Sequence, residues 1–216
     1  ISKQHQMLKS FAPNGSLGGI ALTHAHIGHY SGLLFLGKES LDAKNINVYS
    51  MPKMSFFLKN NGPWSQLIQE KNIVINKLKN DSIQTLSKYI SIRPILVPHR
   101  DEFSETVGYI IKGKDKSVLF IPDIDKWENW NIKIENLIRK VDYAFIDGTF
   151  YDENEIPYRN MDEIPHPFII ETLKRFENIK ENDKKKIYFI HLNHTNPLLK
   201  PKNKLTKEVI RKGFNI

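Results

Sequence analysis

Short apolar runs alternate with polar and glycine-containing segments along most of the chain. Runs rich in isoleucine, valine and leucine that end at such segments predict buried β-strands. We expect strands at residues 19–22, 46–50, 73–75, 92–97, 107–112, 118–121, 143–146 and 187–190. Residues 113–116, Gly-Lys-Asp-Lys, predict a hairpin turn between two of these strands.

Apolar residues that recur three or four positions apart predict helices between the strands. We expect helices at residues 30–36, 55–59, 64–70, 127–140 and 168–180. Strands and helices are mixed along the whole chain, and the sequence contains no internal repeat or linker. This pattern predicts one layered α/β domain over residues 1–216, with some strands paired as hairpins.

The stretch richest in candidate chemistry is Thr23-His24-Ala25-His26-Ile27-Gly28-His29, directly after the first predicted strand. Imidazole is the commonest protein ligand of transition metals. In a tight strand-to-helix turn, His24 and His26 project to the same side, and His29 follows one helical turn later. The stretch therefore predicts metal ligands rather than three unrelated histidines.

Other predicted strands also end in a histidine or an aspartate. His99 follows the strand at 92–97. The strands at 118–121, 143–146 and 187–190 are followed in the same way by Asp123, Asp147 and His191. Singly, His99 could be a loop residue, Asp123 a helix cap and Asp147 a turn residue. Together with the histidine stretch they predict a metal site, because strand ends in α/β folds converge at one edge of a sheet.

The histidine stretch resembles the His-x-His-x-Asp-His signature of the metallo-β-lactamase superfamily. This resemblance implies a four-layer αββα sandwich with one or two metal ions. It implies six metal ligands: His24, His26, His29, His99, Asp123 and His191. The first metal would take the first two histidines and His99, and Asp123 would bridge to a second metal.

Three further segments, at residues 97–100, 147–150 and 191–197, look like the branch that contains pyrroloquinoline quinone biosynthesis protein B. The same branch is similar to cyclic phosphodiesterases of phosphonate metabolism and, more distantly, to transfer-RNA 3′ processing nucleases. In the phosphodiesterases a histidine before the final strand acts on the leaving group. The resemblance places His166 in that catalytic role, and Asp123 would also orient the attacking water.

The chain departs from the signature at Gly28, where the family has aspartate. That aspartate normally binds only the second metal. We therefore expect a tight first site and a weak or empty second site, unless Asp125 or Asp147 takes the missing place. The sequence predicts zinc, one or two ions per chain, with manganese or iron as alternatives.

The composition limits the classes of partner and ligand that this chain could bind. The net charge is +8, but aromatic residues do not interleave with the basic runs, which disfavours a nucleic-acid groove and remains compatible with a small anionic or ester substrate. The chain has no cysteine, so disulfides and thiolate ligands are excluded. No apolar run approaches the ~20 residues of a membrane span.

The resemblance also leads us to expect that early strands lie upstream of Ile1, so that this domain is N-terminally incomplete. Localisation, cytoplasmic or periplasmic, and oligomeric state stay open. The leading interpretation is a metal-dependent hydrolase whose metal-bound hydroxide attacks a phosphodiester or other ester-like bond. The alternatives are an iron-dependent oxidoreductase like the quinone-cofactor protein and a metal-binding protein without catalysis.

Overall fold

The computed structural model describes residues 7, 9–160 and 163–216. The chain forms two compact units, and each has its own sheet. Unit 1 comprises Ile1–Asn80 and Asp101–Glu105, and unit 2 comprises Asp81–Arg100 and Thr106–Ile216. That the two units belong to one domain over residues 1–216 stays a prediction.

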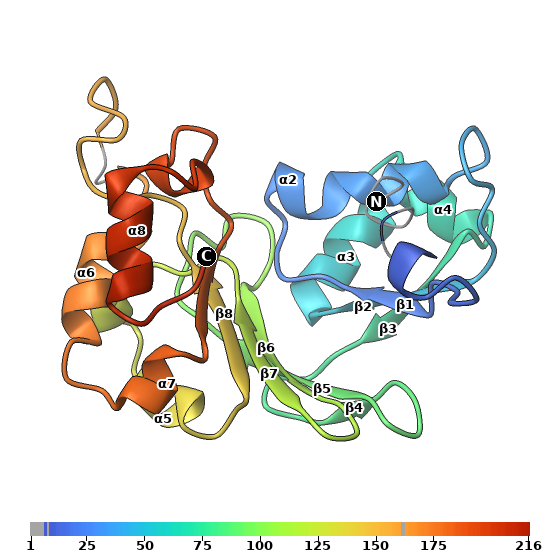
Figure 1. Ribbon diagram of the computed structural model, residues 1–216. Helices are drawn as coiled ribbons and strands as arrows, with labels where there is room; N and C mark the ends of the chain where they lie inside the picture. The colour runs from blue at the N-terminus through green and yellow to red at the C-terminus, as the bar shows by residue number, and fades with distance from the viewer. Residues whose placement is uncertain (1–6, 8, 161–162) are drawn as a thin grey trace. The chain divides into compact units, whose positions relative to one another are not determined.

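Unit 1 contains a three-stranded parallel sheet, in the order β1 (Gly19–Ala21), β2 (Ile46–Ser50), β3 (Ile73–Lys77). Parallel neighbours need a crossover connection, and helices supply both crossovers here. They are α2 (Ile27–Tyr30), η1 (Ser31–Leu36), α3 (Pro52–Asn60) and α4 (Trp64–Gln69). Figure 1 shows these helices on one face of the sheet.

The core of unit 1 lies between this face and the helices. Val48 and Ile73 from the sheet are buried against Leu33, Met54 and Leu58 from the helices. Each such side chain contributes roughly 1.5–3 kcal/mol when it is fully buried. Pro52 begins α3, where its missing N–H costs no helical hydrogen bond.

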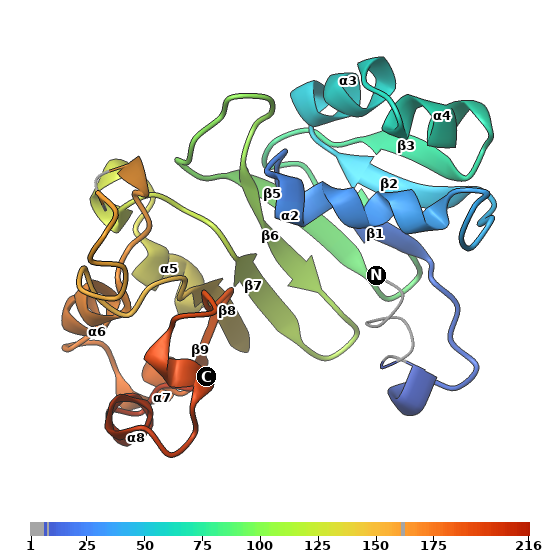
Figure 2. The same ribbon diagram turned by 90° about the horizontal axis from the view of Figure 1, so that it is seen from above.

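Unit 2 contains a six-stranded sheet in the chain order of its strands. The strands are β4 (Gln84–Thr85), β5 (Ser91–Leu96), β6 (Val107–Lys112), β7 (Ser117–Ile121), β8 (Tyr143–Asp147) and β9 (Ile187–Ile190). Neighbours from β4 to β7 are antiparallel, and β7, β8 and β9 are parallel. Figures 1 and 2 show α5 (Ile134–Ile138), α6 (Ile169–Arg175), α7 (Glu181–Lys184) and α8 (Lys204–Arg211) on one face of this sheet.

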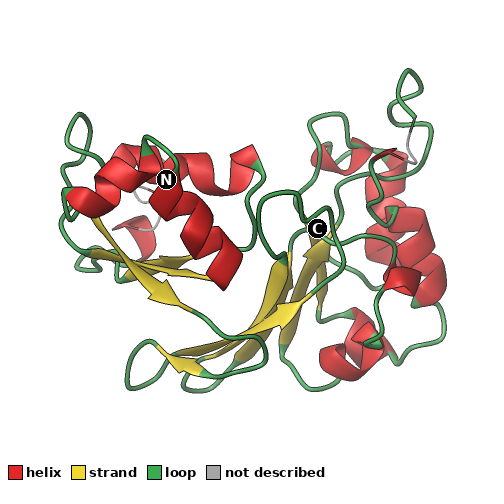
Figure 3. Cartoon of the chain, turned by 180° about the vertical axis from the view of Figure 1, so that it is seen from behind, coloured by secondary structure: helices red, strands yellow, loops and turns green. Residues whose placement is uncertain are grey.

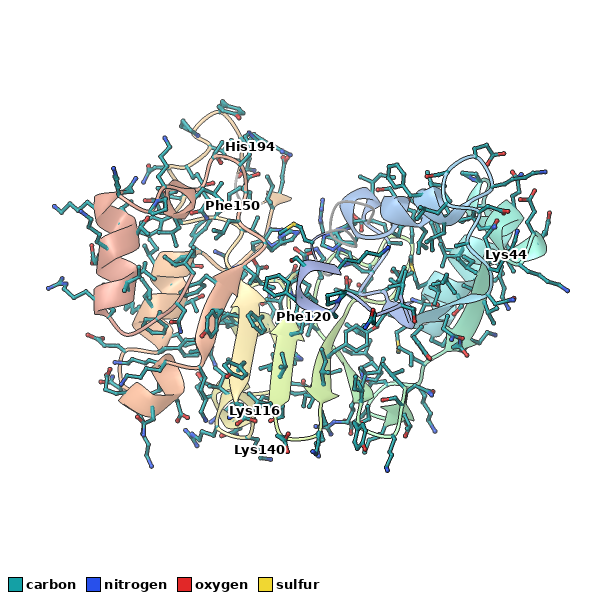
Figure 4. The ribbon with its side chains drawn as sticks, turned by 45° about the vertical axis from the view of Figure 1, so that its right-hand side comes forward. Lys44, Lys116, Phe120, Lys140, Phe150 and His194 are labelled. Atoms are coloured by element: carbon teal, nitrogen blue, oxygen red, sulfur yellow. The ribbon has the colours of Figure 1, made fainter. Side chains whose placement is uncertain are left out.

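This topology brings four strand ends to one edge of the unit 2 sheet. Strands β5, β7, β8 and β9 all run in the same direction, so their carboxyl ends lie together. In Figure 4, Phe150 and His194 lie beyond this edge, and Lys116 and Lys140 lie at the opposite one. The residues that follow these four strands are therefore placed to form a site.

All eight predicted strands are present, and Gly113 closes the predicted hairpin with an N–H bond of 2.8 Å to the Lys116 carbonyl. The sequence did not predict β4, α7 or α8. Figure 3 shows that the helices of unit 2 are short segments separated by loops.

The single helix predicted at 127–140 is wrong. It is divided into η2 (Trp127–Asn129) and α5, because Trp130 is extended, with φ −99° and ψ 126°. The indole of Trp127 donates to Thr172 Oγ1 at 2.9 Å, and that of Trp130 donates to the Leu96 carbonyl at 3.0 Å. These bonds, one buried and one partly buried, hold the two indoles against different elements, where one continuous helix is not formed.

Among the described residues, no helix combines the length and the apolar character that crossing a membrane requires.

The start of β8 is tied to β7 by the Asp142 carboxylate, and this gives a stability prediction. Ser117 donates to Asp142 Oδ2 through its N–H at 2.8 Å and its hydroxyl at 2.9 Å, and Lys116 pairs with Oδ1. These bonds hold the pKa of Asp142 below its ordinary value of 3.8. The stabilisation is therefore present above that value and is lost as the pH falls through the lowered pKa.

Asp142→Ala should lower the free energy of unfolding at neutral pH. The difference in this free energy between the variant and the wild type should become smaller at acid pH. Urea unfolding at stepped pH values measures this, with Asp115→Asn in the nearby hairpin turn as control. A gap that stays constant into the acid range would contradict the prediction.

Candidate metal centre

The predicted histidine stretch forms a compact group in unit 1, with His24 and His26 in the loop after β1 and His29 in α2. His24 is buried, with 1% of its surface exposed, and its Nε2 lies 2.9 Å from Nδ1 of His26. The ring centroid of His29 lies 4.3 Å from that of His24. Two nitrogens on one tetrahedral zinc lie about 3.3 Å apart, given Zn–N bonds of about 2.0–2.1 Å, so this spacing fits a shared cation.

The other ring nitrogens of His24 and His26 contact side chains of unit 1. Nδ1 of His24 lies 3.1 Å from Thr23 Oγ1, and Nε2 of His26 lies 3.1 Å from Glu102 Oε2. When one ring nitrogen of a neutral imidazole donates a hydrogen bond, the other carries the lone pair. If His24 and His26 donate through these nitrogens, Nε2 of His24 and Nδ1 of His26 are the candidate ligand atoms.

A second group lies at the carboxyl edge of the unit 2 sheet. His99 follows β5, Asp123 follows β7, and His166 lies in the loop before α6. All three are buried, and one ligand atom from each lies within 4.8 Å of the others. His99 and Asp123 are nitrogen and oxygen donors of the kind that bind zinc, manganese or iron, and His166 lies beside them.

Asp147, at the end of β8, holds His166 in this group. Its carboxylate is fully buried and lies 2.7 Å from Nδ1 of His166. It also accepts bonds from Thr149 N–H and Oγ1 at 2.9 and 2.7 Å, and from Ile124 N–H at 3.1 Å. Both carboxylate oxygens of Asp147 thus accept hydrogen bonds from the protein. Asp147 is therefore a hydrogen-bond partner that orients His166. Asp125 lies 3.1 Å from Nδ1 of His99 in the same way.

His191, the last predicted ligand, lies at the same edge and contacts Asp123 and Thr149. Its Nδ1 lies 3.3 Å from Asp123 Oδ1 and 2.9 Å from Thr149 Oγ1. Its backbone has φ 60°, in the left-handed region that costs most residues energy. Strained backbone at a candidate site is a recognised sign of function.

The two buried histidines of unit 2 have pKa values shifted in opposite directions. Burial alone would lower the pKa of His166, but the charge and hydrogen bond of Asp147, with the charge of Asp123, raise it above the ordinary value. Burial lowers the pKa of His99, and the nearby His166 adds to this effect. His166 therefore holds a proton more readily than His99.

The segment at 191–197 supports the site mainly through its asparagines. The buried Asn196 amide donates to the carbonyls of Gly148 and Thr149, at 2.9 and 3.1 Å. Asn193 N–H also donates to the Thr149 carbonyl, at 3.0 Å. A Cβ at Gly148 would lie 2.9 Å from Phe189 Cβ, so only glycine allows the two backbones to approach this closely.

His194 is exposed.

Sequence reasoning missed the roles of Glu102, Thr149 and Asp147 as partners of the histidines. Glu102 lies 76 positions from His26, and no spacing pattern in the sequence connects the two. At Gly28, apart from its chain neighbours and the backbone of α2, no described heavy atom lies within 4 Å of the position that a Cβ would take. A Cβ would therefore meet no clash there.

A family profile described as the beta-lactamase superfamily domain matches residues 3–192. The chain belongs to this family. A comparison with curated proteins finds no match. Because the family has the metallo-β-lactamase fold, the predicted α/β fold class is confirmed.

Several solved structures are similar to this superfamily member. Their sequence identities are low, so the similarity shows the fold alone. Zinc-bound PqqB from Methylobacterium extorquens has a TM-score of 0.73 and 18% identity, over 91% of this chain and 67% of that chain. Unliganded yeast PDE1 has a TM-score of 0.58 and 13% identity, over 90% and 63%. The short form of human tRNase Z has a TM-score of 0.55 and 15% identity, over 88% and 78%.

The left-handed backbone of His191 gives a stability prediction. His191→Gly should be more stable than His191→Ala by about 1 kcal/mol, because both lack the imidazole and only alanine keeps the Cβ penalty at positive φ. Urea unfolding of metal-free protein measures the difference. Thr195 serves as the control, because it is not among the described residues with positive φ. There the alanine variant should be more stable than the glycine variant. Equal stability of the two His191 variants would contradict the assignment.

Proposed function

We propose that this protein is a metal-dependent hydrolase of a phosphodiester or other ester-like bond. The observation that carries the proposal is the buried group of His99, Asp123 and His166, with Asp147 bound to His166. A cluster that combines metal-ligand spacing with an oriented, proton-holding imidazole suits hydrolysis better than metal storage.

The proposed metal ligands are those of the family signature and the later strand ends: His24, His26, His29, His99, Asp123 and His191. Zinc is the proposed metal, because these are nitrogen and oxygen donors and the similar PqqB structure is zinc-bound. A bound zinc lowers the pKa of its water toward about 7 and polarises a phosphoryl or carbonyl oxygen.

The chain's own residues supply proton transfer and orientation. Asp147 accepts from Nδ1 of His166, so Nε2 is the atom that exchanges a proton with the leaving oxygen. Asp123 is the second proposed catalytic residue, since its carboxylate can accept a hydrogen bond from the attacking water. A small anionic substrate is favoured by the net charge of +8.

Metal content tests the ligand set. We expect about one zinc per chain in protein stripped with chelator and reloaded, since Gly28 removes a carboxylate from the second site. Gly28→Asp should raise the content towards two, and His24→Ala or His99→Ala should lower it. Elemental analysis measures all four proteins. Equal zinc in the wild type and both alanine variants would refute the ligand set.

Turnover tests the pair of His166 and Asp147. His166→Gln should reduce hydrolysis of bis(p-nitrophenyl) phosphate by roughly 10²–10⁴-fold, with zinc content unchanged. Asp147→Asn should reduce it as well, and the double variant should fall little further, because the two residues act as one unit. Thermal melting identifies any variant that fails to fold. An unchanged rate in His166→Gln would remove His166 from the mechanism.

The same measurements separate the other candidate functions. Iron in the purified protein together with oxygen consumption would favour an oxidoreductase. Tight zinc binding without turnover of phosphodiesters or esters would favour a metal-binding protein that is not an enzyme.

A further inference from the structure

The tip of the loop between β5 and β6, residues 101–105, belongs to unit 1, although both flanking strands belong to unit 2. This tip segment begins two residues after His99 and includes Glu102. One short stretch of chain thus joins a proposed ligand of unit 2 to a partner of a proposed ligand of unit 1.

Three consecutive residues anchor the tip segment within unit 1. The ring of Phe103 lies 5.7 Å from that of Phe57. Ser104 Oγ accepts the N–H of Ala25, the residue between His24 and His26, in a buried bond of 2.8 Å. The Glu105 carboxylate accepts from the N–H of Lys53 at 2.9 Å, at the positive end of α3.

These anchors determine where Glu102 lies. Its side chain is 47% exposed, so a lone hydrogen bond to His26 would contribute little, because water and a free side chain compete with it. The neighbouring anchors hold the backbone of Glu102, and this reduces the entropy lost when the carboxylate meets His26 Nε2 at 3.1 Å.

We propose that Glu102 is a positioning residue that fixes the tautomer of His26. By accepting a hydrogen bond from Nε2–H, Glu102 keeps the proton on Nε2 and leaves Nδ1 unprotonated and facing Nε2 of His24. His26 is then ready to bind a metal through Nδ1 without a change of tautomer or ring orientation. The value of this role for metal binding depends on the proposed function, in which His26 is a ligand.

The tautomer can be measured in metal-free protein. At a pH where the imidazoles are neutral, ¹⁵N NMR of the histidine rings should report a protonated Nε2 and a bare Nδ1 for His26. Glu102→Gln keeps an acceptor oxygen and should retain this tautomer, whereas Glu102→Ala should lose the bias. A wild-type tautomer in Glu102→Ala would overturn the proposal.

Zinc affinity, measured by competition with a chromophoric chelator, gives the second readout. Glu102→Ala should bind zinc about 10–100-fold more weakly than the wild type, and Glu102→Gln should restore most of the affinity. Equal loss in both variants would overturn the proposal, because the charge of Glu102 would then matter rather than its hydrogen bond. An unchanged affinity in Glu102→Ala would also overturn it.

The two readouts distinguish failure of this inference from failure of the proposed function. If wild-type protein binds no zinc, the proposed function fails, and the tautomer measurement still decides whether Glu102 positions His26. If the wild type binds zinc and Glu102→Ala matches it in both readouts, only the positioning role is rejected.

Discussion

The buried carboxylate of Asp147 is the group on which the candidate site of unit 2 depends. It is fully buried, and it accepts hydrogen bonds from Ile124, Thr149 and His166. A buried donor that loses its acceptor costs about 1–3 kcal/mol, so these bonds hold two other segments, at Ile124 and His166, to the end of β8. Through Thr149 the same network reaches His191. The positions of both histidines therefore follow from one aspartate.

The same physical arrangement occurs in both units. His24, His26 and His166 each have one ring nitrogen beside an oxygen, supplied by Thr23, Glu102 and Asp147 respectively. An oxygen acceptor fixes the tautomer and the orientation of an imidazole and leaves the second nitrogen with a defined direction. Metal binding and proton transfer both need a ring nitrogen with a fixed protonation state and a fixed orientation. The oxygen partners fix both.

The sequence predicted the fold well where a single local pattern determines the structure. Apolar runs such as the one that forms β9 are strands, because a short run of β-branched and aromatic residues favours a strand over a helix. The prediction failed at residues 127–140, where helical spacing was present but two indole N–H groups found partners on different elements. Periodicity describes one face of a helix and carries no information about a hydrogen bond to a distant residue.

For the candidate site, the sequence by itself predicted the kinds of candidate ligand, and it determined their places after strands, because those places depend only on local order along the chain. It also named His166 and the departure at Gly28. Only the tertiary structure decided that His166 joins His99 and Asp123, that Asp147 is a partner of His166, and that Glu102 reaches His26. The last two contacts join residues 19 and 76 positions apart, and the folded backbone alone brings such residues together.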